Sequence, residues 1–187
     1  MFQKIFGRDK AEDAAEKLYA SAVTAARQPV LYERYGVPDT LDGRFEMIAL
    51  HVYVILRRLR TGEKAARPMA QKLFDTMFVN MDRTLREMGV GDLSVGRRVK
   101  EMAQAFYGRV AAYDAALVGG GPEKIEPALA RNVFRLPEDQ RSEQAAALAA
   151  YLFSLAVALE SQDVNGFERG EVSFPAPADP ESADVVR

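Results

Sequence analysis

The chain has 187 residues, of which 48% are hydrophobic, so it can bury the core of one domain. It contains no cysteine, which excludes disulfides, thiolate catalysis and cysteine-ligated metal centres. The net charge is −2, but residues 57–100 hold 11 basic and 5 acidic side chains, against 14 basic and 22 acidic in the rest. This basic middle predicts either an anionic partner or neutralisation by the protein's own acidic helices.

The N-terminal residues carry no recognisable targeting signal. Residues 1–8 mix large apolar and basic side chains, and we expect a short segment outside the folded domain. They lack the apolar core of about 7–15 residues that a secretory signal needs, and nearby acidic residues argue against a transit peptide. The first helix is expected from Asp9 to the residue before Pro29, because alanine, leucine and valine recur there at helical spacing.

A connection rich in proline and glycine follows, and Thr40 or Asp42 is placed to cap the next helix. That helix, residues 45–60, carries one charge, Glu46, in its first twelve residues. A helix that is apolar nearly all round belongs in the middle of a bundle. His51, the only histidine, lies in this helix without a nucleophile motif nearby, so we expect a hydrogen-bonded residue of the core or its boundary.

Two long amphipathic helices are expected within residues 68–117. The first has an apolar stripe of Leu73, Phe74, Met77, Phe78, Met81, Leu85 and Met88. Gly89 and Gly91 supply left-handed positions at its end, and Asp92 or Ser94 can cap the second helix. The second stripe consists of Val95, Val99, Met102, Ala103, Phe106, Val110, Tyr113 and Leu117. The short connection predicts an antiparallel hairpin.

The C-terminal third predicts a short helix over residues 122–134 and a second apolar helix around residues 145–159. Neither this run nor residues 45–56 reaches the ~20 residues of a spanning helix, so we expect no helix that crosses a membrane. Residues 164–187 predict an acidic, proline-rich and partly disordered tail. Residues 9–163 are therefore expected to form one all-α domain, a bundle of about six helices around the hairpin.

Motifs for catalysis or metal binding are not found in the sequence. The Glu-x-x-His element of di-iron bundles and the lysine of a P-loop are missing. Asp75 and Asp82 share a helix face, but Lys72 and Arg86 are placed to pair with them. A salt-bridged surface is the simpler interpretation of these carboxylates, and no cofactor or metal is expected.

Methionine is concentrated in the first helix of the hairpin, at Met69, Met77, Met81 and Met88. Thioether side chains adapt to irregular apolar partners, so surfaces that accept hydrophobic clients use them. The other interpretation is that these methionines fill the core, and the sequence leaves both open.

Cations gather in the first turns of the second helix, at Arg97, Arg98 and Lys100. The helix dipole disfavours positive charge at this end. Compensation is expected either from the protein's own Glu87, Asp92 and Glu101 or from an anionic partner.

Residues 31–60 and 73–117 together resemble the ubiquinol-cytochrome c chaperone family, assembly factors for the respiratory cytochrome bc complex, and the similarity extends over about residues 15–158. Residues that match the central motif of the family are Phe74, Asp75, Met77, Asn80, Met81, Asp82, Arg83, Leu85, Arg86, Met88, Gly89, Asp92, Val95 and Lys100. The resemblance implies an all-helical, non-enzymatic domain that binds newly made cytochrome b until it acquires haem and joins the reductase. The mitochondrial relatives work with a small partner protein and near the ribosome exit, and neither property is carried over.

The resemblance suggests a function for the apolar and charged residues of the hairpin, namely binding of a client protein. The predicted client-binding residues are Phe74, Asp75, Met77, Phe78, Asn80, Met81, Asp82, Arg83, Arg86 and Met88. Arg97, Arg98 and Lys100 are predicted to face the membrane or another anionic partner. Because no presequence is evident, we expect a bacterial protein at the cytoplasmic face of the inner membrane, in peripheral contact with anionic lipid and with no nucleic-acid substrate.

Two other classes of protein stay open. A helical-bundle protein or enzyme could bind haem or quinone between the two apolar helices, with His51 and tyrosines as polar anchors. A generic scaffold or toxin-like regulator is the third class, and it differs from a chaperone in that no membrane protein would accompany it.

Overall fold

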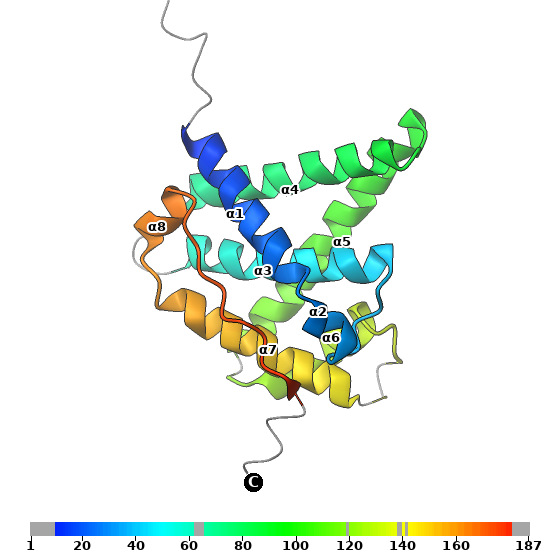
Figure 1. Cartoon of the computed structure of the whole chain (residues 1–187), viewed down its shortest axis with the longest axis vertical. Coiled ribbons are helices and arrows are strands. Elements are labelled where there is room, and N and C mark those ends of the chain that lie inside the picture. Colours follow the sequence, from blue (N-terminus) through cyan, green and yellow to red (C-terminus); the bar gives the residue numbers. More distant parts are fainter. Residues whose placement is uncertain (1–9, 62–65, 119, 138–139, 141, 181–187) are drawn as a thin grey trace, which may run out of the picture.

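The computed structural model describes residues 10–61, 66–118, 120–137, 140 and 142–180. These residues form eight α-helices and one short 3-10 helix, and they contain no β-strand (Figure 1). The predicted all-α class is therefore confirmed. The expected N-terminal segment, residues 1–8, and the end of the expected tail, residues 181–187, lie outside the described residues.

The elements follow one another as α1 (Lys10–Ala26), α2 (Pro29–Glu33), α3 (Leu41–Arg60), α4 (Arg67–Glu87), α5 (Asp92–Val118), η1 (Pro122–Lys124), α6 (Glu126–Asn132), α7 (Glu143–Glu160) and α8 (Val164–Glu168). Figure 1 shows α3 across the middle of the molecule, with α4 above it, α7 below it and α1 crossing both α3 and α4. The helix predicted over residues 122–134 is present as η1 followed by α6.

The central helix α3 begins at a capped turn. The side chain of Thr40 accepts a hydrogen bond from the backbone N–H of Gly43 at 3.1 Å, so Thr40, and not Asp42, is the cap. Most of α3 is buried, including Met47, Leu50 and Ile55. Because it packs against α1, α4 and α7, most of its nearly continuous apolar sequence is covered by other helices.

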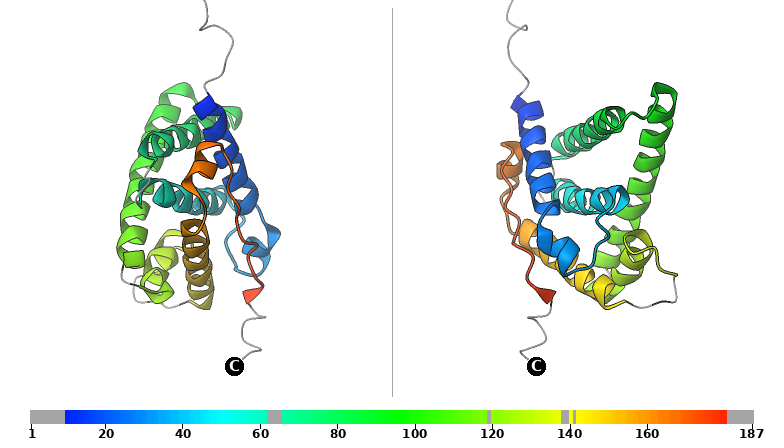
Figure 2. Two further views of the ribbon diagram at one scale, coloured as in Figure 1. Left: turned by 90° about the vertical axis from the view of Figure 1, so that its left-hand side faces the viewer. Right: turned by 45° about the vertical axis from the view of Figure 1, so that its right-hand side comes forward.

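Helices α4 and α5 form the predicted hairpin around a short loop. Of the two glycines in the loop, only Gly89 is left-handed, with φ 81°, and the carboxylate of Asp92 forms an ion pair with Arg86. The helices diverge from the loop, so that they make two arms of a V (Figure 2). Away from the loop, the rings of Phe74 and Phe106 bridge the arms with their centroids 5.9 Å apart.

Helix α7 is the second apolar helix that the sequence predicts. It alone, among the described helices, is long and apolar enough to cross a membrane by length and composition, with a mean hydropathy of 1.2 over 18 residues. However, 44% of this helix is buried inside the molecule, and it packs against α3 and α6. A core helix has these same properties, so the composition of α7 gives little weight to a membrane span.

The first part of the expected tail packs on the body. Val164 and Phe167 in α8 are buried, and the hydroxyl of Tyr35 donates to the carbonyl of Ala178 at 2.9 Å. The ring of Phe174 lies edge-on to His51, with centroids 5.4 Å apart. Residues 164–180 therefore extend the surface of the helical body (Figure 1).

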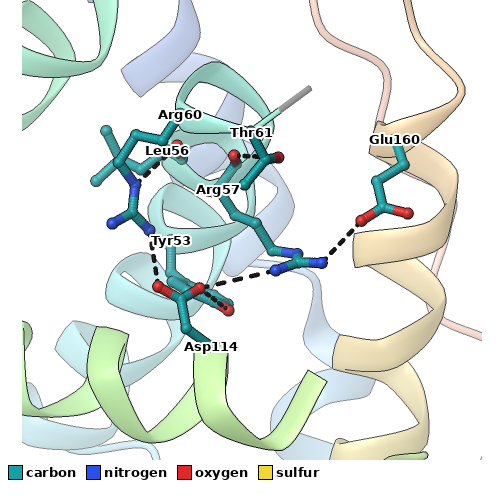
Figure 3. Close-up of polar contacts among 7 residues, drawn as sticks. All are labelled: Tyr53, Leu56, Arg57, Arg60, Thr61, Asp114 and Glu160. Carbon is teal, nitrogen blue, oxygen red and sulfur yellow. Dashed lines mark hydrogen bonds and ion pairs between the residues drawn. The ribbon is translucent and has the colours of Figure 1, made fainter. Parts of the chain in front are cut away.

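A polar cluster fastens the C-terminal end of α3 to two other helices (Figure 3). The carboxylate of Asp114 in α5 accepts a hydrogen bond from the Tyr53 hydroxyl at 2.8 Å. The same carboxylate pairs with Arg60 at 3.2 Å and lies 3.9 Å from Arg57. Arg57 also reaches Glu160 of α7 at 2.9 Å, so one cluster holds α3, α5 and α7 together.

Candidate functional site

An open groove of about 930 Å³ lies among the helices, and we call it the hairpin groove. Its lining residues come mainly from α4 and α5 near their loop, from the first half of α3 and from the second half of α1. Figure 2 shows how these helices are arranged. Its size is at the upper end of the range for small-ligand pockets, and its openness also suits a peptide segment.

The walls of the groove come from five helices, α1 to α5, and from the connections between helices. Its apolar side chains are Tyr19 and Val23 from α1, Tyr32, Leu41, Phe45 and Ile48 from α2 and α3, Met81, Leu85 and Met88 from α4, and Met102 and Ala105 from α5. Adaptable thioethers and aromatic rings dominate this set, as in surfaces that accept variable apolar partners.

A buried ion pair joins α3 to α5 at the groove. Arg109 donates two hydrogen bonds to the carboxylate of Glu46, one of them from Nε at 2.6 Å. Burial raises the pKa of Glu46, and the hydrogen bonds from Arg109 oppose that rise. The guanidinium also lies 5.8 Å from the centre of the Phe45 ring, so Arg109 positions a carboxylate and an aromatic ring of the groove.

The remaining charges of the groove do not balance. Six arginines and four carboxylates line it. Arg44 pairs with Asp39 at 2.6 Å, and Arg135 lies 3.4 Å from Asp42.

Three groove arginines, Arg27, Arg83 and Arg98, form no ion pair with any residue in the described ranges. Arg83 donates only to the side-chain oxygen of Asn80. Two of them lie near the same phenol, because Arg27 and Arg83 both oppose the rise that burial causes in the pKa of Tyr19. The groove therefore presents apolar walls with an excess of positive charge.

The predicted client-binding residues separate into four places. Asn80, Met81, Arg83 and Met88 line the hairpin groove. Met77 and Phe78 belong to the core, with Met77 fully buried, so the core interpretation of the methionines holds there and also for Met69. Phe74 lines a smaller hollow of about 370 Å³ between α3, α4 and α5.

The other charged members of the predicted set, Asp75, Asp82 and Arg86, lie on the surface of α4 outside the groove. Asp75 accepts a hydrogen bond from Gln71 at 2.8 Å. Asp82 pairs with Arg86 at 2.6 Å, the i,i+4 pair that the spacing indicates. Their role in client binding stays a prediction.

The three cations at the start of α5 point in different directions. Arg98 lines the groove, whereas Arg97 and Lys100 are exposed on the outside of the helix. Of the internal compensators, Asp92 is held by Arg86, and Glu101 lies 3.9 Å from Arg97. Lys100 has no ion pair within the described ranges, so the explanation by an anionic partner remains for Lys100 and Arg98.

His51 is fully buried and bonded at both ring nitrogens. Nδ1 lies 2.7 Å from the carbonyl oxygen of Met47, and because that oxygen only accepts, Nδ1 carries the proton. Nε2 then accepts from the hydroxyl of Tyr151 at 2.9 Å. The expectation of a hydrogen-bonded core histidine is confirmed, and this contact between α3 and α7 leaves neither nitrogen of His51 free for haem or quinone.

Several residues of the groove were not indicated by the sequence patterns. Tyr19 lies in α1, whose spacing predicted only a core face, and Arg27 directly follows the last residue of that helix. Glu46 carried a signal, because a single charge in an apolar helix predicts a buried partner. Its partner, Arg109, is 63 residues away and no local pattern points to it.

Comparison with known proteins gives one family. A family model described as "Ubiquinol-cytochrome C chaperone" matches residues 33–174. The ubiquinol-cytochrome-c reductase complex assembly factor 1 of Xenopus laevis is 23% identical over 113 residues, which are 60% of this chain and 56% of that protein. The human protein of this name is 26% identical over 137 residues, 73% of this chain and 46% of that protein. The chain spans about half the length of the curated relatives it matches.

A solved structure is similar over most of its length. The crystal structure of the Cbp3 homolog from Brucella abortus has 35% sequence identity and a TM-score of 0.77, over 89% of this chain and 91% of that chain. Helices α3, α4 and α5 of the hairpin groove lie within the residues that the family model matches, whereas α1 precedes them.

Proposed function

The chain belongs to the ubiquinol-cytochrome C chaperone family, and we propose that it is a non-enzymatic assembly chaperone for the ubiquinol-cytochrome c reductase complex. In this proposal its client is newly made cytochrome b, and it works in peripheral contact with the cytoplasmic face of the bacterial inner membrane. The family membership supports the assembly role. The client and the location are the finer parts of the proposal.

The observation that supports client binding is the hairpin groove, with its apolar walls and three arginines that form no ion pair among the described residues. A membrane protein that is not yet assembled exposes apolar helices together with charged loops. Met81, Met88 and Met102 provide adaptable apolar contact, and Arg27, Arg83 and Arg98 provide the charge that would receive a carboxylate or a helix C-terminus. Binding of this kind needs no catalytic residue.

The test is a strain that lacks the gene, complemented with the wild type or with the groove variant Arg27→Glu, Arg83→Glu, Arg98→Glu. We expect the groove variant to lose cytochrome b from its affinity-purified complexes and to lower the haem b difference spectrum of membranes. The matched control reverses three exposed cations away from the groove, Lys10→Glu, Lys124→Glu and Arg169→Glu, with the same change in net charge.

Two results would contradict different parts of the proposal. Normal haem b and reductase activity in the deletion strain would remove the assembly role. A normal client complex with the groove variant, and a loss with the control variant, would move the client site away from the groove. Circular dichroism and urea unfolding of each purified variant test whether the charge reversals have unfolded the protein.

A further inference from the structure

The loop between α4 and α5 carries large apolar side chains into water. We define the hairpin tip as residues 88–93; it projects from the body where the two arms of the V meet, at the upper right of Figure 1. Leu93 is 99% exposed and Met88 is 56% exposed. A Cβ placed on Gly89 or Gly91 would meet no atom within 4 Å, so no other part of the described chain covers the tip.

Packing within the described chain does not account for these apolar residues. Leu93 is in the first turn of α5, but the stripe that holds α5 to the body begins at Val95, which is fully buried. A leucine whose side chain is almost completely exposed adds nothing to the core. Exposed apolar residues that are grouped at one projecting point mark an interaction site.

Two cations follow Leu93 on the same face of α5. Arg97 is one turn and Lys100 two turns further, at i+4 and i+7. With a rise of about 1.5 Å per residue, they lie about 6 Å and 10 Å behind Leu93 along the helix. The side chain of Arg97 is 73% exposed and its carboxylate neighbour, Glu101, is 3.9 Å away.

Negative charge near the tip is partly neutralised. Asp92 pairs with Arg86, while Glu87 is exposed beside it. These carboxylates limit the attraction to an anionic surface, and they make it depend on salt.

We propose that the hairpin tip docks end-on into an anionic lipid surface. Met88 and Leu93 enter the boundary between headgroups and acyl chains, and Arg97 and Lys100 meet the phosphates. The order along α5 supports lipid over a protein pocket, because apolar groups come first and cations follow about 5–10 Å behind, the depth to which interfacial helices bury their apolar side. The inference rests on the membrane contact in the proposed function and gives that contact its residues.

The test uses the purified full-length chain and lipid vesicles alone, so it does not depend on the client. Sedimentation is measured with vesicles of equal phosphatidylglycerol and phosphatidylcholine, and with phosphatidylcholine only. We expect the wild type to prefer the anionic vesicles, and Arg97→Glu, Lys100→Glu to weaken that binding by about tenfold or more. Leu93→Gln is expected to weaken it several-fold. Val118→Gln is the matched control, because Val118 is 83% exposed at the opposite end of the same helix.

A fluorescence measurement reports insertion directly. The chain has no tryptophan, so Leu93→Trp introduces a single reporter at the tip and Val118→Trp introduces one at the control position. A blue shift on anionic vesicles is expected for the tip reporter and not for the control.

Three outcomes would overturn the inference. They are equal binding of the wild type to both vesicles, unchanged binding of Leu93→Gln, and no blue shift for Leu93→Trp. If tip variants bound vesicles normally but lost the client, the tip would be a protein contact. If the tip variants lost vesicle binding but kept a normal client complex, the inference would be supported. Client binding in the groove would then be a separate property.

Discussion

Glu46 in α3 and Arg109 in α5 form a bidentate ion pair beside the hairpin groove, with side chains that are only 2% and 10% exposed. Removal of one partner from such a pair leaves an uncompensated charge in a site that is largely shielded from water. We predict that Glu46→Ala lowers the free energy of unfolding by about 3–5 kcal/mol, measured by urea denaturation.

The control for this prediction is the exposed pair of Asp39 and Arg44, whose side chains are 58% and 61% exposed. Asp39→Ala is expected to leave the unfolding midpoint unchanged, because water already screens that pair. The double variant Glu46→Met, Arg109→Leu should recover most of the loss, since apolar replacements remove both buried charges. If the double variant were as unstable as Glu46→Ala, packing of the stems, and not the unpaired charge, would explain the loss.

His51 makes the stability depend on pH. Burial lowers its pKa from 6.5 to about 4, so in this interval the unfolded chain binds a proton at His51 that the folded chain does not. The free energy of unfolding therefore falls as the pH drops from about 6.5 to about 4, by about 3 kcal/mol in total, and this contribution stays constant above and below the interval.

The measurement for His51 is urea unfolding across that pH interval, for the wild type and for His51→Gln. The glutamine has no titrating group but can still bond to Met47 and Tyr151, so it keeps the contact between α3 and α7. Carboxylates contribute the same pH dependence to both proteins. A wild-type slope no steeper than that of His51→Gln would show that His51 does not titrate in this interval.

Asp114 is the acceptor on which Tyr53, Arg57 and Arg60 converge (Figure 3). Burial, with Asp114 beside it, raises the pKa of the Tyr53 phenol, so this hydroxyl remains a donor. We predict that Asp114→Ala destabilises the fold by about 1–3 kcal/mol, because the Tyr53 hydroxyl loses its partner.

A double-mutant cycle separates this hydrogen bond from the ion pairs. In a Tyr53→Phe background, Asp114→Ala is expected to cost clearly less than in the wild type. If Asp114→Ala lowered the free energy of unfolding equally in the two backgrounds, the loss would be due to the ion pairs with Arg57 and Arg60. Glu160→Ala, at the 51% exposed end of the cluster, is the mild control.

The sequence pattern predicted the helices well, for a physical reason. Leu73, Met77 and Leu85 recur at helical spacing and are buried in α4. The nearly uniform apolar sequence of α3 likewise predicted a helix with partners on all sides. Spacing within one helix reports which of its faces is apolar, and it is independent of how two helices are placed relative to each other.

That independence explains why the groove was not predicted. The groove depends on how segments that are distant in the sequence pack together. Examples are the opening between α4 and α5, the contact of Tyr19 from α1 with the groove, and the pairing of Glu46 with Arg109. The pattern indicates Asn80, Arg83 and Met88 as candidates, but it indicates Met77 equally, and Met77 is fully buried in the core.

Gly43 and Gly96 lie in helices but are expected to respond to alanine in opposite ways. A Cβ on Gly43 would lie 1.9 Å from the carbonyl oxygen of Pro38, a backbone atom that cannot move without disturbing the loop beside the groove. A Cβ on Gly96, in α5, would meet nothing within 4 Å. We predict that Gly43→Ala destabilises the fold by about 1–3 kcal/mol or more, through overpacking. Gly96→Ala should stabilise it by about 0.5–1 kcal/mol, because alanine is the better helix former.

Thermal and urea unfolding of the two variants, measured against the wild type, check this pair of predictions. Each variant adds the same single methyl group. The sign of the change in stability therefore depends on the space around that methyl group and on the conformation of the local backbone. A stable Gly43→Ala would mean that α3 can begin without the close approach of Pro38, and the wall of the groove formed by residues 39–41 would then be adjustable. A destabilised Gly96→Ala would mean that the outer face of α5 is in contact with another part of the protein in solution.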